Sequence, residues 1–589
     1  FSQSPGLIEE RGVYLAGSTC WVPRFSDDLI TFDQTVSLPR AWDAVSQGRR
    51  TRHEVKLNRQ ITRWDEDAPT EEVYLIAAEF HEYSKTTGAV EVMAFLRTPD
   101  ESLANKYLET TSQYLEMYRT LIGLFPFSKF ALVENFWATG YGMPSFTLLG
   151  EEIIRFPFIL HSSYPHELLH NWWGNSVYVD FERGNWCEGL TTYLADHLIK
   201  EQRGQGQEYR RTTLQKYTDY VTPENDFPLT EFINRYDAPS EAIGYGKSLM
   251  LFNMLRSKMG DTRFVKALQE FYRQYKFKKA GFSGIQRVFE EVSGEDLEQF
   301  FHQWTQRTGA PDLQLNNTEV RKKNGAYILR FSLQQVQKAD PFILDIPVAV
   351  TFADSTIMKK VSMTAAEQTW EFSFPDQPLL LQIDPRFEIM RRLHYAEVPP
   401  SLSSIYGMED ILILLPSQSP NLEIYQELAK IWAKDKSKNI SIKLDSDVDT
   451  LPDGRGVWVF GPENRHTDVI RSGIAEYEAE IGPVLVKLGK TDLNVRDNSI
   501  ILAVRHPADP RSVAVWLTIH DREAVPGLAR KLPHYGKYSY LAFQGKEPTN
   551  IAKGEWGTVN SPLTAELDAK AAEITPNLPH RPALAYLAP

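Results

Sequence analysis

The segment "HELLHNWWGNSVYVDFERGNWCEGL", residues 166–190, carries the residue types of a zinc site. His166 and His170 are four residues apart, which on an ideal helix places them about 40° apart and one turn above each other. Both imidazoles can then reach one metal ion at about 2.0–2.1 Å. Glu188 follows His170 after seventeen residues and begins the apolar run "GLTTYLADHL", which predicts a second helix. Glu188 is therefore the natural third ligand, and a fourth position stays open for water.

Glu167 lies about 100° around the same helix from His166. This direction points beside the metal and not at it, where the carboxylate could take a proton from metal-bound water as a general base. Zinc lowers the pKa of such water to about 7, which allows attack on a carbonyl. The alternative is a core helix with two satisfied histidines, because a lone His-Glu-x-x-His also arises by chance. The downstream Glu-Gly and the aromatic-rich connector favour the zinc site.

These motifs resemble those of the zinc aminopeptidases of the gluzincin clan, the group that contains membrane alanyl aminopeptidase and leukotriene hydrolase. "HELLHNWWGN" is similar to the family's His-Glu-x-x-His followed by Asn/Gln-Trp-x-Gly-Asn, and "NWCEGL" to its Trp-Leu-Asn-Glu-Gly. The resemblance implies that His166, His170 and Glu188 hold the zinc and that Glu167 is the general base. There are two departures. The connector has seventeen residues where the family usually has eighteen, and Cys187 replaces the usual asparagine.

The resemblance implies roles for two further stretches. "AIGYGKSLMLFNMLRSKMGDTRF" is similar to the family's Tyr-Glu-Lys-Gly helix, so Tyr245 would donate a hydrogen bond to the transition-state oxyanion. The alternative for Tyr245 is a packed side chain at the start of a core helix. The family binds the substrate's α-ammonium through Gly-x-Met-Glu-Asn, and "ALVEN" would make Glu134 and Asn135 the substrate-binding pair. A second alignment uses "GYGMPSF" instead and puts Pro144 where the glutamate belongs.

The resemblance implies a zinc-dependent aminopeptidase with one Zn²⁺ per chain, which hydrolyses the N-terminal bond of peptides that have a free amino terminus. Zinc-activated water would attack the bond, with Glu167 as general base. A zinc endopeptidase is the alternative if Glu134 does not bind the amine. A third hypothesis, from another class, is a non-catalytic binding protein that retains the peptidase fold. The intact set of site residues disfavours that hypothesis.

Composition excludes several other classes. The 589 residues carry a net charge of -13 without a long block of lysine or arginine, so nucleic acid is not an expected partner. Two cysteines exclude a disulfide framework. No apolar stretch reaches the roughly 18 residues of a membrane span, and we expect a soluble protein. The chain begins at Phe1 without an initiator methionine, as a chain that has lost a leader would, so the sequence leaves the compartment open between cytoplasm and export. It leaves the oligomeric state open too.

Hydrophobic patterning predicts a multidomain α+β protein. Residues 1–100 form a β-rich N-terminal region, in which "EEVYLIAAEF" and "AVEVMAFLR" are strands separated by the turn-prone "HEYSKTTG". By resemblance this region is a truncated form of the family's β-domain, and residues 101–309 are a thermolysin-like, mainly helical catalytic domain. Residues 310–397 predict a small β-sandwich, and residues 398–565 an α/β domain with a largely parallel sheet. Residues 566–589 predict an extended tail. We do not expect the family's usual C-terminal helical domain in residues 398–565, because their pattern is α/β instead.

Overall fold

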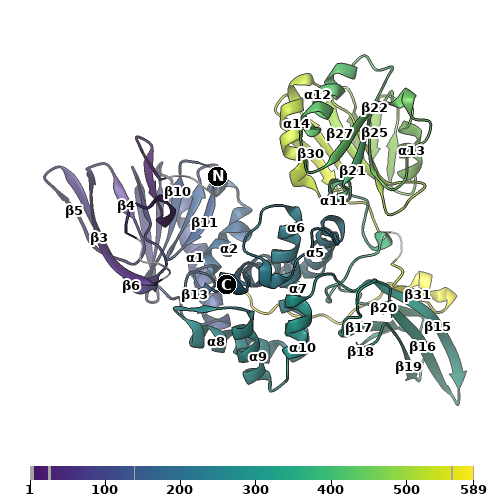
Figure 1. Ribbon diagram of the computed structural model, residues 1–589, viewed down its shortest axis with the longest axis horizontal. Helices are drawn as coiled ribbons and strands as arrows, with labels where there is room; N and C mark the ends of the chain where they lie inside the picture. The colour runs from purple at the N-terminus through teal and green to yellow at the C-terminus, as the bar shows by residue number, and fades with distance from the viewer. Residues whose placement is uncertain (1–5, 24–27, 138, 559–560, 588–589) are drawn as a thin grey trace.

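Strands, helices and then strands again follow one another along the chain in the computed structural model (Figure 1), which describes residues 6–23, 28–137, 139–558 and 561–587. This alternation confirms the expected multidomain α+β character. Among the described residues, no helix combines the length and the apolar character that crossing a membrane requires.

Two small antiparallel sheets open the chain. The first has the strand order β1-β2-β7-β4 and the second the order β3-β6-β5. The side chains of β3 alternate between half-buried and exposed, which is typical of a sheet with one solvated face. The bounds of these strands are β1 Leu7–Glu9, β2 Gly12–Leu15, β3 Ile30–Pro39, β4 Asp43–Val45, β5 Arg49–Lys56, β6 Arg59–Thr70 and β7 Leu75–Ala78.

A five-stranded sheet joins this region to the helices, in the order β11-β12-β10-β9-β8. Its strands are β8 His81–Thr87, β9 Val90–Leu96, β10 Lys129–Asn135, β11 Gly140–Met143 and β12 Phe146–Gly150. Helix α1, Glu101–Leu121, crosses from β9 to the parallel strand β10 and is capped by Asp100, whose side chain accepts from the Leu103 N–H. The sheet therefore continues across residue 100. The segment "HEYSKTTG", which we expected to be a turn, is mostly strand β8.

The helical part packs around the end of this sheet and carries the zinc motif. Its helices are α2 Ser163–Leu169, α3 Cys187–Thr192, α4 Leu198–Gln202, α5 Gly206–Tyr220, α6 Ala238–Glu241, α7 Ser248–Met259, α8 Asp261–Tyr275, α9 Phe282–Ser293 and α10 Glu298–Phe301. Wider π-type turns join α3 to α4 (η5, Tyr193–His197), join α6 to α7 (η7, Ala242–Lys247) and follow α10 (η8, His302–Gln306). Short parallel strands β13, Val177–Val179, and β14, Lys278–Ala280, tie the connector after α2 to the segment before α9.

Two antiparallel sheets follow the helices. They have the orders β15-β16-β19 and β18-β17-β20-β31. Tyr327, Leu329, Phe331 and Leu333 of β16 fall on one face as expected, and the last three are fully buried. The strands are β15 Leu313–Lys323, β16 Ala326–Gln335, β17 Leu344–Thr351, β18 Thr356–Met363, β19 Glu367–Phe374, β20 Leu380–Ile383 and β31 Thr564–Glu566.

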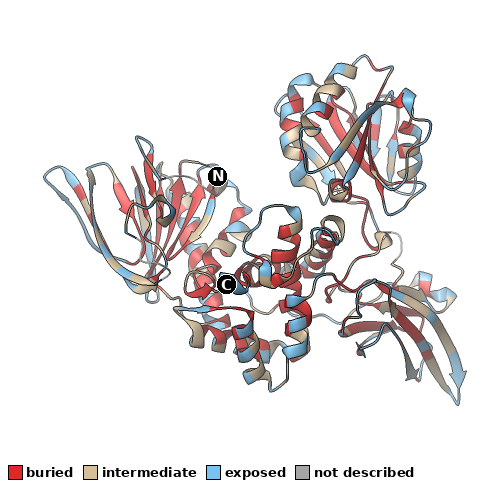
Figure 2. Ribbon diagram, in the orientation of Figure 1, coloured by how far each residue is buried: buried red, intermediate tan, exposed pale blue. Residues whose placement is uncertain are grey.

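A seven-stranded mixed sheet, in the order β22-β21-β23-β28-β27-β29-β30, forms the last unit, and its central strands are buried on both faces (Figure 2). The first four strands in this order run parallel to one another, whereas β27, β29 and β30 each pair antiparallel with the preceding strand. We expected a largely parallel sheet, and the observed sheet is mixed. The strands are β21 Asp410–Leu415, β22 Asn439–Leu444, β23 Gly456–Phe460, β27 Asn498–Arg505, β28 Val513–Leu517, β29 Tyr540–Gln544 and β30 Thr549–Gly554, and a small sheet adds β24 Ala479–Ile481, β25 Leu485–Leu488 and β26 Thr491–Asn494. The helices are α11 Leu402–Gly407, α12 Leu422–Trp432, α13 Thr467–Gly473 and α14 Val525–Lys531.

This α/β unit docks on the catalytic helices through α11, which packs against α5. The hydroxyls of Ser403 and Ser404 donate to the half-buried carboxylate of Asp219 on α5. A Cβ at Gly407 would lie 1.9 Å from the carbonyl oxygen of Asp219, so only glycine allows this approach. After β31 the chain returns to the catalytic helices, where the Ala585 carbonyl accepts from Gln202 at 2.8 Å.

Candidate metal centre and its cavity

Helix α2 presents the zinc motif because its two faces differ. Tyr164, Pro165, Leu168 and Leu169 are buried and fix the helix, whereas His166, Glu167 and His170 face a cavity. The two imidazoles lie one turn apart with ring centroids 4.8 Å from each other. The spacing of the apolar residues thus turns both histidines to the same side.

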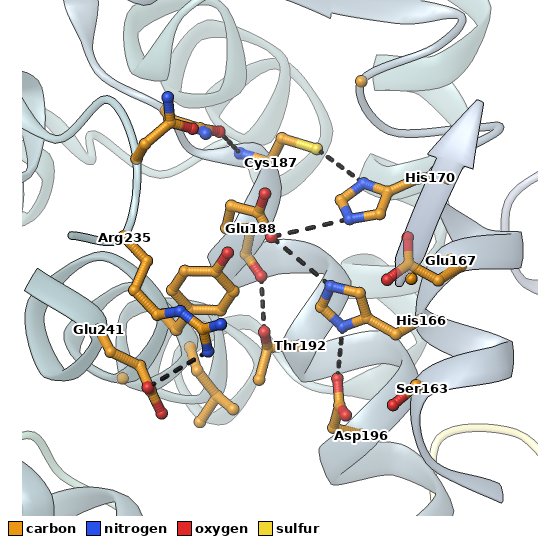
Figure 3. Close-up of a pocket in the computed structure, with 18 of the residues that line it drawn as sticks. Ser163, His166, Glu167, His170, Cys187, Glu188, Thr192, Asp196, Arg235 and Glu241 are labelled. Atoms are coloured by element: carbon orange, nitrogen blue, oxygen red, sulfur yellow. Dashed lines mark hydrogen bonds and ion pairs between the residues drawn. The ribbon is translucent and has the colours of Figure 1, made fainter. Parts of the chain in front are cut away.

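Glu188 comes from the first turn of α3. Its Oε2 lies 3.5 Å from Nε2 of His166 and 3.7 Å from Nε2 of His170, so the three donor atoms surround one point (Figure 3). Helix α3 crosses α7 closely at Gly189, where a Cβ would lie 2.0 Å from the Ser248 hydroxyl. The structure therefore brings together the three side chains that the sequence proposed as ligands.

The outer nitrogens of both imidazoles are already engaged. Nδ1 of His166 lies 2.7 Å from Oδ2 of Asp196, and Nδ1 of His170 lies 3.1 Å from the Trp173 carbonyl oxygen. Protons on Nδ1 leave the Nε2 lone pairs aimed at the shared point, which is how histidine ligands are oriented in metal sites. The donor set of two imidazoles and one carboxylate thus fits a divalent ion such as zinc.

Charges at the centre favour a cation there. Burial acts to raise the pKa of Glu188, but His170 and His166 lower it to about 2, so the carboxylate is ionised at neutral pH. Burial acts to lower the pKa of His166, yet Asp196 and Glu188 raise it well above its usual value. The negative charge of Asp196 and Glu188 that raises this pKa would equally stabilise a metal ion at Nε2, while Asp196 keeps its proton on Nδ1.

Glu167 lies between the metal centre and strand β11. A Cβ at Gly142 would come within 2.9 Å of both the Glu167 carbonyl oxygen and its Oε2. Burial raises the pKa of Glu167, although the two histidines beside it act in the opposite direction. Glycine in β11 therefore allows the carboxylate to sit against the edge strand.

Tyr245 approaches from the other side, on η7. Its ring is stacked with that of His166 at a centroid distance of 6.5 Å, and its hydroxyl interacts with Glu188. Burial and the Glu188 charge raise the pKa of the phenol above its usual value, so it is a neutral donor at pH 7.

The centre opens into a cavity of about 1410 Å³. Its walls come from four parts of the chain: the N-terminal sheets, strand β11, the helices α2 to α6, and the α/β unit. The α/β unit contributes the segment Pro533–Lys537, with His534, Gly536 and Lys537, and also Ser403. This volume exceeds the roughly 300–1,000 Å³ typical of small-molecule pockets and can hold several peptide residues.

Glu134 and Asn135, which we expected to bind substrate, are not among the residues that line this cavity. All seven residues of β10 are buried between neighbouring parallel strands. The carboxylate of Glu134 binds Arg155 Nη1 at 2.6 Å and the Arg97 N–H at 2.7 Å. The structure thus does not support the alignment on "ALVEN". It places the competing segment, residues 140–146, with β11 beside Glu167.

Several residues that line the cavity were not among the site residues expected from the sequence. Asp196 follows Glu188 by eight residues on the same helical stretch, and that two-turn spacing was an available signal. Glu71 and Glu72, in the connection between β6 and β7, and Arg235, before α6, also line the cavity. Their positions depend on contacts between distant segments, so no local pattern marks them.

A second group of possible ligands, Asp43, His53 and Glu82, lies in the N-terminal sheets. Arg50 binds both oxygens of Glu82 at 2.6 Å and lies 4.0 Å from Asp43. Because the guanidinium already neutralises this group, we assign no metal to it.

Taken together, the two histidines, the carboxylate ligand, the adjacent glutamate and the phenol have the arrangement of a gluzincin-type metallopeptidase centre. Residues 161–304 match the peptidase family M1 domain. The family resemblance seen in the sequence is thereby confirmed.

Named relatives agree with this assignment. The chain is 21% identical over 347 residues to the alanine/arginine aminopeptidase of Saccharomyces cerevisiae, which covers 56% of this chain and 39% of the relative. It is 32% identical over 154 residues to aminopeptidase M1-B of Oryza sativa subsp. japonica, and this match covers 25% of this chain and 17% of the relative. A probable aminopeptidase 2 of Sulfurisphaera tokodaii is 20% identical over 296 residues, and this match covers 46% of this chain and 38% of the relative. The chain thus spans well under half the length of these relatives.

Proposed function

We propose that this chain is a zinc-dependent metalloaminopeptidase, which hydrolyses the first peptide bond of substrates with a free amino terminus. The observation that carries the proposal is the convergence of His166, His170 and Glu188 on one point, with Glu167 and Tyr245 beside it in a single cavity. The relatives named as aminopeptidases support the same activity.

The metal would be held by the Nε2 atoms of His166 and His170 and by the carboxylate of Glu188, one ion per chain. A zinc ion bound there supplies Lewis-acid chemistry, because it polarises the scissile carbonyl and makes water a stronger acid. Asp196 and the Trp173 carbonyl would keep the two imidazoles in the required tautomer.

The chain's own residues account for the remaining steps. Glu167 takes the proton of the attacking water and passes it to the nitrogen of the departing amine, a role that suits a buried carboxylate whose pKa is raised. The neutral phenol of Tyr245 donates a hydrogen bond to the oxygen that becomes negatively charged. Strand β11 pairs with β12 on one side and borders the cavity on the other, so its open edge can pair with the substrate backbone.

The α-ammonium of the substrate needs a carboxylate on the side of the cavity away from the departing amine. Glu71 and Glu72 line the cavity where the N-terminal sheets meet β11. Glu72 is half-buried, and its Oε2 accepts the Gly17 N–H at 3.2 Å, which fixes its position. We infer that this pair, and not Glu134, receives the amine.

The test uses aminoacyl amides with a chromogenic leaving group, each beside its N-acetylated twin. We expect cleavage of the free-amine members only. Cleavage should be lost in Glu167→Gln and after removal of metal by a chelator, and restored by zinc in the wild type. Glu72→Gln should raise KM about tenfold, as expected for loss of a charge-assisted contact. Glu134→Gln is the matched control and should leave KM within about twofold of the wild type.

Two results would contradict the proposal. Equal cleavage of acetylated and free substrates would show an endopeptidase. A zinc-loaded protein that cleaves no member of the panel would favour the non-catalytic binding protein.

A further inference from the structure

The cations that line the cavity lie on one side, which Asp196, Glu208 and Glu241 also line, and two further carboxylates lie on the opposite side. The carboxylates Glu71 and Glu72 come from the N-terminal sheets, whereas the cations come from elements on the other side of α2 (Figure 1). These cations are Lys200 of α4, Lys216 of α5, Arg235 before α6, and Lys537 of the α/β unit. A peptide that lies across the centre with its amine near Glu72 therefore extends its leaving portion toward these cations.

Arg235 and Lys216 share one carboxylate. Glu241 accepts from Lys216 Nζ at 2.7 Å through Oε1 and lies 3.4 Å from Arg235 Nη1 through Oε2. Two cations against one anion leave a net positive charge. The Arg235 contact is also long for a charge-assisted hydrogen bond, and a guanidinium has five N–H donors to offer.

This group lies close to the reacting centre. Glu241 precedes Tyr245 by four residues on the continuous helix of α6 and η7, so its carboxylate is about one turn from the phenol. Figure 3 shows Arg235 beside Glu241, to which a dashed line joins it, with Glu188 close by. The side chains of Arg235 and Lys216 are 58 % and 47 % exposed, so a ligand in the cavity can reach both.

We propose that Arg235, together with Lys216, recognises a carboxylate on the leaving-group side of the substrate, one residue beyond the scissile bond. Glu241, the partner of Arg235, lies about one helical turn of 5.4 Å from Tyr245, and one residue of extended chain spans about 3.5 Å, so we assign the carboxylate to the second residue of the peptide. The carboxylate can be the C-terminus of a dipeptide or the side chain of an acidic second residue. The inference rests on the proposed aminopeptidase activity and adds the substrate class: short or acidic peptides.

The first experiment compares matched substrates with the wild-type, zinc-loaded chain. One arm pairs dipeptides as free acids with the same dipeptides as C-terminal amides. A second arm pairs amides that have aspartate or asparagine at the second position. We expect kcat/KM to favour the carboxylate about fivefold, mainly through KM, which corresponds to about 1 kcal/mol. The arm that shows the larger preference identifies the source of the carboxylate. In tetrapeptides the preference for the free acid over the amide should disappear.

Substitution then assigns the preference to residues. Arg235→Gln should bring the acid-to-amide ratio of kcat/KM close to one, Lys216→Gln should lower it partly, and Arg235→Lys should keep part of it. Arg273→Gln is the matched control, because Arg273 is 71 % exposed on α8 and pairs with Glu270 away from the cavity. The acid-to-amide ratio of kcat/KM in Arg273→Gln should equal that of the wild type.

The inference is overturned if acids and amides are cleaved alike, or if Arg235→Gln lowers kcat/KM of both members equally. These outcomes leave the aminopeptidase proposal intact, since both require cleavage. Absence of cleavage of every member would remove the proposed function and this inference with it.

Discussion

Replacing Asp196 tests whether the metal centre depends on a residue that does not touch the metal. Oδ2 of Asp196 lies 2.7 Å from Nδ1 of His166, and the carboxylate is 24 % exposed. The contact fixes the tautomer of the ring and increases the basicity of Nε2. Nδ1 of His170 has only uncharged partners, the Trp173 carbonyl oxygen at 3.1 Å and the Cys187 Sγ at 3.4 Å, so His166 is the better-supported ligand of the two.

The magnitude follows from what each substitution leaves behind. Loss of such a partner costs about 10–100-fold in metal affinity. Asp196→Asn keeps an oxygen that can accept from Nδ1 but removes the charge, so we expect zinc to bind about tenfold more weakly, or about 1.4 kcal/mol. Asp196→Ala removes the acceptor as well, and we expect zinc to bind about 100-fold more weakly.

The assay is competition for zinc with a chromophoric chelator, followed by kcat/KM at saturating zinc. Asp345→Asn is the matched control, because Asp345 is 34 % exposed and pairs with Lys258 at 3.3 Å far from the centre. Zinc affinity in both Asp196 variants within about twofold of the wild type would refute the reasoning. It would mean that the ring of His166 is held by packing alone.

Three further predictions follow from single contacts. Tyr245→Phe should lower kcat by about 10²–10³ with little change in KM, because only the oxyanion loses a donor; an unchanged kcat would exclude that role. Gly142→Ala should lower kcat, because the added Cβ would lie 2.9 Å from the Glu167 carboxylate and 3.1 Å from Cβ of His170; full activity would show that β11 moves to accommodate the methyl group. Burial lowers the pKa of Lys129 to about 7, below its unfolded value near 10.5. The unfolded chain therefore binds more protons between these pH values, and stability should rise from pH 7 to pH 10. Thermal unfolding should show a steeper rise in the wild type than in Lys129→Met, in which Lys247, whose pKa burial lowers to about 8, still contributes; equal slopes would contradict it.

The helical part of the site could be predicted because it depends on local spacing. His166 and His170 repeat at one helical turn, and the buried residues between them share that period, so sequence alone fixes which side they face. Glu188 could be proposed because an apolar helix follows it. Tyr245 became a candidate only through the resemblance, since a tyrosine at the start of a core helix has no chemical signature of its own.

The amine-binding side could not be predicted, because it depends on which strand lies at the edge of the sheet. "ALVEN" keeps a Glu-Asn pair but forms the buried strand β10, whereas the glutamate-free segment of β11 lies at the centre. Sequence order does not reveal that β11 lies outside β12. Hydrophobic runs likewise predicted the strands of the last unit but not their direction, because parallel and antiparallel buried strands have the same apolar pattern.

The α/β unit adds to the cavity without touching the metal centre. Its helix α11 is fixed to α5 through Asp219, and α5 also carries Lys216 three residues earlier. The same docking brings Lys537 to the cavity wall. The ligands, the base and the phenol all lie on segments before residue 250, and none of them belongs to this unit. The set of cations in the cavity does depend on the unit, because Lys537 belongs to it and Lys216 lies on the helix against which it packs. Damage to the docking surface should therefore weaken binding of carboxylate-bearing substrates while zinc affinity stays unchanged.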